Sequence, residues 1–182
     1  MPTKPVKTRT APGKAFTKQP HSRSIVPDAD LTELLITGLR ELYWAENHLV
    51  QHLPRIQEAA GGNALRKAVA EHWKVTKGHV VRLEKAFIDL GVEVKARKCD
   101  GMEALVMEGE GVVDATKPGS KPRLIGLIAA CQKVENYEIT AYSGLARLAS
   151  RLGHTGISEL LEANMAEERE ADNTLASIAE QQ

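Results

Sequence analysis

The sequence has few cysteines, few aromatic residues and no long apolar run. Only Cys99 and Cys131 are present, too few for a disulfide framework, which favours a reducing compartment. No apolar run approaches the ~20 residues of a membrane-spanning helix, and the N-terminus lacks the roughly 7–15-residue apolar stretch of a secretory signal. We therefore expect a cytoplasmic protein with no membrane partner.

Charge balances over the whole chain but not along it. Acidic and basic residues number 24 each, yet residues 1–27 hold six Lys and Arg and no acidic residue. Because these residues also lack periodicity, we interpret 1–28 as a disordered basic tail and 29–182 as one domain. The tail is either a solvated arm or a weak nucleic-acid contact, since clustered positive charge attracts phosphate. Phe16 is its only aromatic residue, so nothing favours base stacking.

Apolar residues recur at three- and four-residue steps over four long stretches, which predicts four helices. These stretches cover residues 30–60, 63–91, 120–152 and 154–178. We expect Asn63 to cap the second helix and Ser120 the third. Within the connection between them, residues 99–115 predict a short helix lying across the bundle. The predicted fold class is therefore all-α: a ferritin-like four-helix bundle with a long crossover carrying a short fifth helix.

The third stretch carries carboxylates within its apolar stripe. Stepping on from Cys131 by four, three and four residues gives Glu135, Glu138 and Tyr142. Burial of carboxylates is costly unless something pairs with them. The same stretch also contains Gly126, one of two glycines that each cost roughly 1 kcal/mol against alanine in a helix; the other is Gly144.

Ionisable residues occupy inner positions near the middle of the other helices as well. They are Glu46, His79 and Glu168, with Asp172 one turn after Glu168. Mid-helix positions share one level in a four-helix bundle, so these side chains are expected to converge with Glu135. An internal repeat supports this, because Ala45-Glu46-Asn47 aligns with Val134-Glu135-Asn136, and the pair Val75 and His79 aligns with the pair Glu168 and Asp172.

Carboxylates and an imidazole held by rigid helices are the ligands that two divalent iron or manganese ions require. The competing interpretation is structural. A lone buried glutamate is more often hydrogen-bonded or paired with a base than a metal ligand, and His79 alone would more often be a satisfied core histidine. Ionisable groups on every long helix at one level favour the metal site.

Four segments carry a family resemblance. ELYWAENHLVQHLPRIQEAA, HWKVTKGHVVRLEKAF, CDGMEALVMEGE and CQKVENYEITAYSGLARLA resemble the YciE/YciF family of bacterial ferritin-like proteins, over about residues 29–181. The resemblance implies a stress-associated helical bundle that forms a homodimer. The activity of the family is poorly defined, so the resemblance indicates the fold more firmly than the function.

The resemblance also implies a set of metal ligands. They are Glu46, His79, Glu135, Glu168 and Asp172, with Glu138 as a further candidate. The sequence departs from the family at Val75, where relatives are expected to carry glutamate, and position 79 can also be glutamine in relatives. We therefore expect a dinuclear or partly degenerate iron or manganese site that oxidises iron or consumes peroxide. The alternative is a non-catalytic structural or partner-binding bundle, tethered to DNA by its basic tail.

Overall fold

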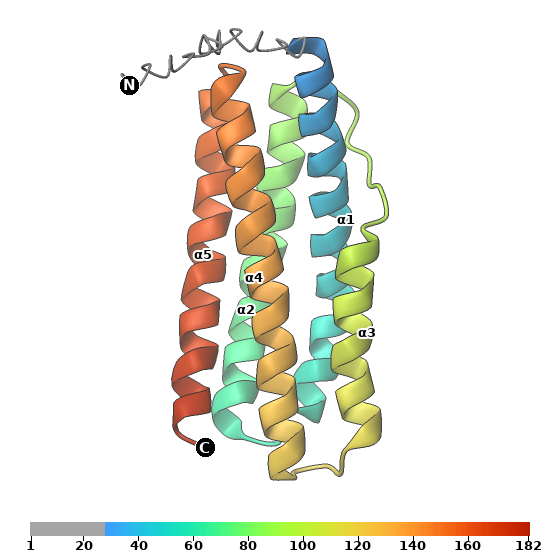
Figure 1. Cartoon of the computed structure of the whole chain (residues 1–182), viewed down its shortest axis with the longest axis vertical. Helices are drawn as coiled ribbons and strands as arrows, with labels where there is room; N and C mark the ends of the chain where they lie inside the picture. The colour runs from blue at the N-terminus through green and yellow to red at the C-terminus, as the bar shows by residue number, and fades with distance from the viewer. Residues whose placement is uncertain (1–27) are drawn as a thin grey trace, which may run out of the picture.

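Five helices make up the part of the chain that the computed structural model describes, residues 28–182. They are α1 (Asp28–Ala59), α2 (Asn63–Asp89), α3 (Asp100–Ala115), α4 (Lys121–Arg151) and α5 (Thr155–Glu180), and no strand occurs among them. The four long helices run up and down side by side, and the crossover from α2 to α4 carries α3 (Figure 1). The predicted fold class is confirmed. Residues 1–27 of the predicted basic tail lie outside the described part.

The short helix α3 differs from the prediction in its direction. It lies lengthwise beside α1 and α4 and not across the bundle (Figure 1). Its buried residues are Met102, Val106 and Gly109, and the close approach at Gly109 allows the lengthwise position. At Gly109 a Cβ atom would stand 3.6 Å from the Cβ of Ala130 in α4 and 3.8 Å from Cδ1 of Ile56 in α1. The helix therefore fills the seam between these two long helices.

The helix ends agree with the sequence at some positions and not at others. Ser120 caps α4 as predicted, because its Oγ accepts a hydrogen bond of 3.3 Å from the backbone N–H of Arg123. Asn63 does not cap α2. The capping position is Gly62, the last residue with extended backbone (φ −131°, ψ 146°), and Asn63 is already helical. Gly91 follows α2 with φ +68°, a conformation that favours glycine.

Two apolar clusters fill the bundle and leave a polar layer between them. One cluster includes Leu35, Leu39, Leu83, Tyr142 and Leu161; the other includes Leu49, Leu53, Val69, Leu127 and Leu175. Each long helix passes from one cluster to the other, and buried ionisable residues interrupt its apolar stripe at the crossing. These residues are Glu46 on α1, His72 and His79 on α2, Glu135 and Glu138 on α4, and Glu168 on α5.

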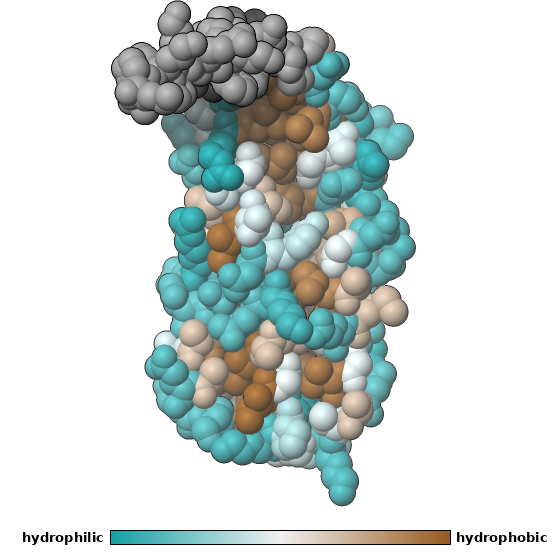
Figure 2. Space-filling model, viewed as in Figure 1, coloured by the Kyte–Doolittle hydropathy of each residue, from teal (hydrophilic) through white to brown (hydrophobic). Residues whose placement is uncertain are grey.

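Polar residues cover most of the face seen in Figure 2, and apolar residues show in patches between them. This distribution is typical of amphipathic helices that bury one stripe each. Within residues 28–182, none of the helices has the length and apolarity needed to cross a membrane.

Two glycines of α4 give a matched test of how α3 packs. Gly144 has no atom within 4 Å of where a Cβ would lie, whereas a Cβ at Gly126 would stand 2.7 Å from Cγ1 of Val112 on α3. We expect Gly144→Ala to raise the free energy of unfolding by about 1 kcal/mol. Gly126→Ala should lower it by about 1–2 kcal/mol, because the β-branched Val112 must shift. Urea denaturation of both variants measures the difference; equal stabilisation would contradict the described contact.

Candidate metal centre

The polar layer contains two overlapping groups of metal-ligating side chains. The first is His72, Glu135, Glu138 and Glu168, and the second is Glu46, His79 and Glu168. Within each group, one ligand atom per residue lies within 4.8 Å of the others. Every one of these side chains is buried, none more than 8% exposed. The four long helices thus supply four carboxylates and two imidazoles to one level of the bundle.

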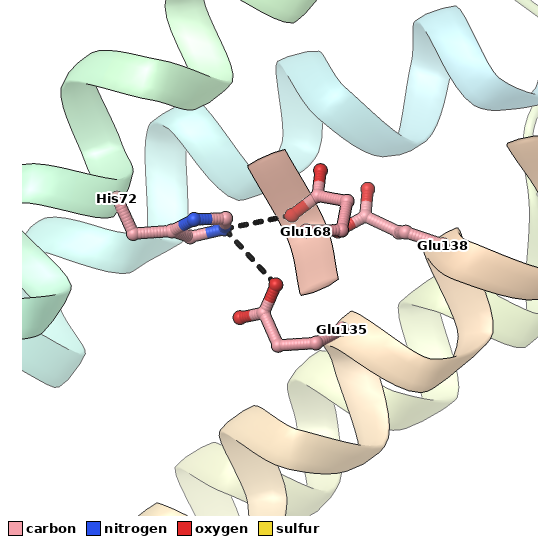
Figure 3. Close-up of side chains that lie close together, drawn as sticks. All are labelled: His72, Glu135, Glu138 and Glu168. Carbon is pink, nitrogen blue, oxygen red and sulfur yellow. Dashed lines mark ion pairs between the residues drawn. The ribbon is translucent and has the colours of Figure 1, made fainter. Parts of the chain in front are cut away.

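In the first group, His72 approaches two carboxylates from different helices. Its Nε2 lies 3.4 Å from Glu135 Oε2 and 3.7 Å from Glu168 Oε2. Figure 3 shows His72 reaching from α2 toward Glu135 on α4 and Glu168 on α5, with Glu138 beside Glu168. None of these ligand atoms has a hydrogen-bond partner among the described residues. These atoms face one another, and within the described residues no side chain donates a hydrogen bond to their oxygens.

In the second group, the imidazole of His79 also approaches two carboxylates from different helices. His79 Nδ1 lies 2.8 Å from Glu168 Oε1 and 3.3 Å from Glu46 Oε1, and it makes no hydrogen bond within the described chain. Glu168 is shared, with Oε1 toward His79 and Oε2 toward His72. A carboxylate whose two oxygens face two different groups is placed to bridge two cations.

The orientation of His79 is fixed from its other side. Its Nε2 lies 2.9 Å from Glu167 Oε2, and because a carboxylate only accepts, Nε2 carries the proton. Glu167 is held in turn by Arg82, whose Nη1 and Nη2 donate over 2.7 and 2.8 Å. A carboxylate that holds the distal N–H of a histidine, so that the other nitrogen faces inward, is a common support for metal-binding histidines.

A second arm of the same network holds Glu46. Tyr142 O–H donates to Glu46 Oε1 and accepts a hydrogen bond of 3.0 Å from Asn164 Nδ2. Asn164 is held by Arg82 Nη1, which donates to its Oδ1 over 2.8 Å. Because Tyr142 occupies Oε1, the unpartnered oxygen of Glu46 is Oε2. Arg82 therefore orients ligands on both α1 and α2.

The unpartnered atoms show that the residues fit a pair of cations. Eight buried nitrogen and oxygen atoms of the six ligand residues lack a hydrogen-bond partner in the described chain. They are Glu46 Oε2, His72 Nε2, His79 Nδ1, Glu135 Oε2, both oxygens of Glu138 and both oxygens of Glu168. The atoms of His72, His79, Glu135 and Glu168 lie in ion pairs with one another. Glu46 Oε2 and the two oxygens of Glu138 have neither kind of partner in the described chain, and a single unpartnered buried polar group costs about 1–3 kcal/mol. Four carboxylates also carry the charge that two divalent cations neutralise.

The shifted pKa values of Glu135, Glu138 and His79 also indicate that the layer lacks positive charge. Burial, and then the charge of Glu168, raises the pKa of Glu135 well above its usual value. Burial, and then the charge of Glu46, does the same for Glu138. Burial alone would lower the pKa of His79, but the charges of Glu46 and Glu168 overcome it and raise the pKa to about 10. The centre therefore favours either bound protons or a bound cation.

The donor set has the composition of a dinuclear site in an altered arrangement. Ferritin-like dinuclear sites take a glutamate from each of two helices and a Glu-x-x-His pair from each of the other two, which gives four glutamates and two histidines. Here both histidines stand on α2, and α4 carries two glutamates. Val75 supplies no carboxylate, and His72, one turn before it, reaches Glu135 and Glu168 instead.

Sequence reasoning named five of the six clustered residues and missed His72. The signal was present, because His72 lies in the apolar stripe of its helix, seven residues before His79. The predicted ligand Asp172 is not in either group. It is half-buried and accepts hydrogen bonds from Gln132 Nε2 (3.0 Å) and Asn136 Nδ2 (3.3 Å). That the clustered residues bind a metal stays a prediction.

Comparisons with known proteins agree with the fold. The family described as a domain of unknown function (DUF892) matches residues 30–182. Protein YciF of Escherichia coli strain K12 is 33% identical over 150 residues, which are 82% of this chain and 90% of YciF. The crystal structure of that stress protein gives a TM-score of 0.78 over 82% of this chain and 94% of YciF, at 32% identity.

A second solved structure, YcfI from Rhodopseudomonas palustris, is described as that of a candidate structural protein. It also gives a TM-score of 0.78, at 30% identity, and covers 85% of this chain and 96% of its own.

Substitution of Glu138 tests whether this residue is a metal ligand or a glutamate with a purely structural role. Both of its oxygens are buried and unpartnered, so Glu138→Leu should stabilise the protein in the presence of a chelator, by about 1–3 kcal/mol. The same variant should bind less metal. Guanidinium denaturation with and without chelator, together with metal analysis, measures both effects. A glutamate with a purely structural role would give the opposite result in chelator, a loss of stability.

Proposed function

Because this chain belongs to the YciE/YciF family of ferritin-like proteins, matched by DUF892 over residues 30–182, we propose that it is a stress-associated metal protein. Its bundle binds two divalent iron or manganese ions, and the loaded centre oxidises iron or consumes peroxide. The observation that carries the proposal is the convergence of eight unpartnered ligand atoms from four helices within one buried layer. The expected homodimer is part of the proposal.

The ligands divide between the two ions. His72, Glu135 and Glu138 would hold one ion, Glu46 and His79 would hold the other, and Glu168, which belongs to both groups, would contribute to each. When bound, such a pair of ions supplies electron transfer with dioxygen or a peroxide. Carboxylates are hard oxygen ligands and imidazole suits iron, so the set favours iron or manganese over softer, thiolate-preferring metals. Cys131 lines a cavity beside Glu135 but belongs to neither ligand group.

The surrounding residues keep the ligands ready for metal. Glu167 holds the Nε2 proton of His79, so that Nδ1, which faces Glu46 and Glu168, is the nitrogen that can exchange its proton for a metal ion. Tyr142 O–H occupies one oxygen of Glu46 and leaves the other open. Apolar clusters flank the layer on both sides along the bundle, and their low polarity strengthens the attraction between carboxylates and cations.

The alternative function is a structural or partner-binding bundle without redox chemistry. The description of YcfI as a candidate structural protein favours it. In that case Glu135 and Glu138, whose pKa values are raised, would remain protonated, and the histidines would pair with Glu168 without a metal. Bound metal therefore separates the two functions directly.

Metal content is the first test of the proposal. Protein purified from cells supplied with iron and manganese should contain about two metal ions per chain, measured by elemental mass spectrometry. Glu168→Gln should lose most of both ions, because Glu168 belongs to both ligand groups. Asp172→Asn is the matched control on the same helix and should keep the wild-type content. Wild-type content below about a tenth of an ion per chain would remove the redox function.

Position 75 tests whether the missing carboxylate limits binding. Val75 lines the same cavity as His72 and Glu135, so a glutamate there can add an oxygen ligand. We expect Val75→Glu to tighten metal binding by about tenfold or more, because the new carboxylate adds an oxygen ligand and a negative charge to the site. Calorimetric titration with Mn²⁺ measures the change. Val75→Gln provides the control of equal size without charge; unchanged affinity in Val75→Glu would count against the family alignment at this position.

A further inference from the structure

A cavity of about 530 Å³ opens between α2 and α5 and reaches the metal layer. Its walls are matching stripes of the two helices, from residue 64 to residue 75 on α2 and from residue 167 to residue 178 on α5. Each stripe spans 12 residues, or about 16 Å of helix between its first and last residue. The cavity is therefore a long channel that runs from the end of the bundle to its middle, of the size that holds a small molecule.

Small and apolar side chains make most of the channel wall, and the exposed residues Lys67, Glu71, Glu170 and Thr174 stand along its opening. Ala64, Ala68 and Ala171 stand where larger side chains would close the gap between α2 and α5, and Leu175 and Ile178 line its outer part. Walls of this kind bind an apolar chain because they remove its surface from water, at about 0.8 kcal/mol for each buried CH₂. A branched or flat ligand would not follow two parallel helix stripes.

The inner end of the channel is polar and lacks partners. His72 and Glu135 line it, and their buried Nε2 and Oε2 atoms have no hydrogen-bond partner in the described chain. A hydroxyl group can both donate to the carboxylate and meet the imidazole nitrogen. An anionic head group would instead face Glu135 and the nearby Glu168, 3.7 Å from the same imidazole nitrogen. Like charges in a buried site repel strongly.

We propose that this channel, lined by α2 and α5, binds an unbranched apolar chain with an uncharged O–H head group at the His72–Glu135 end. Long-chain alcohols and alkyl hydroperoxides belong to this class. As the substrate class of a peroxide-consuming centre, the inference rests on the proposed function, whereas the binding itself does not require metal. The chain lies along the alanines and the head group reaches the ligand layer.

Calorimetric titration of the full-length protein with decanol tests the binding. We expect one decanol per chain with chelator present, because His72 Nε2 and Glu135 Oε2 are then free to meet the hydroxyl group. In the same chelator-treated protein, decanoate, which has the same chain and an anionic head, should bind at least about tenfold more weakly. Absence of saturable decanol binding to the chelator-treated protein, or equal binding of decanoate to it, would overturn the inference. Metal content is measured separately, so failure here leaves the result for the metal site distinguishable.

Two alanines of α5 give the matched variants. Ala171 lines the channel, and Ala171→Phe should weaken decanol binding at least about tenfold. Ala179 is exposed on the same helix and lies outside the channel, so Ala179→Phe should leave the affinity unchanged. Ala68→Phe, on the facing wall, repeats the test if circular dichroism shows that Ala171→Phe does not fold. Equal weakening by Ala179→Phe would contradict the proposed place of binding.

A second copy of the chain is the competing occupant of the channel. Sedimentation of the wild type and of Ala171→Phe distinguishes it. A change from dimer to monomer in the variant would show that the channel face is a subunit interface and would overturn the ligand proposal. An unchanged assembly together with lost decanol binding supports it.

Discussion

The structure depends on four carboxylates that are buried within reach of one another. Their burial costs free energy, and their mutual repulsion adds to the cost, as the raised pKa values of Glu135 and Glu138 express. Two imidazoles within the same layer offset only part of the charge. A chain selected for stability alone would carry leucine at these positions. The retained acids therefore indicate a layer kept for a cation, and the two apolar clusters on either side supply the stability that the layer lacks.

The fold was readable from the sequence because helix periodicity and loop punctuation agree along most of the chain. Four stripes, Ser120 at a cap and glycine after α2 all gave the correct elements. The direction of α3 was not readable, because a short amphipathic stripe fits a lengthwise seam and a crosswise contact equally well. Only the close approach of Gly109 to α1 and α4 decides between them. The capping residue of α2 was missed for a similar reason, since Gly62 and Asn63 are both compatible with a helix start.

The sequence predicted the level of the candidate site in the bundle better than it predicted the individual ligands. Interruptions of the apolar stripe at Glu46, His79, Glu135 and Glu168 correctly predicted that these residues share one layer. Periodicity places a residue on the inner face of a helix but does not tell which neighbours its side chain reaches. His72 was therefore not named as a ligand, whereas Asp172 was, although Gln132 and Asn136 donate hydrogen bonds to its side chain. A spacing of four after Glu168 in place of three explains why Asp172 stays aside.

The two halves of the site differ in a way that the internal repeat does not predict. Around Glu46 and His79, a hydrogen-bonded network of Tyr142, Asn164, Glu167 and Arg82 holds the ligands in place. Within residues 28–182 no such network surrounds His72 Nε2 and Glu135 Oε2, and the channel between α2 and α5 begins there. A rigid half fixes the geometry of its ligands, whereas an open half admits a reactant. Val75, where the family resemblance predicts a glutamate, lies in the open half and forms part of the channel wall. A glutamate at this position would add an oxygen ligand and narrow the inner end of the channel, so the valine favours access to the site over one more ligand.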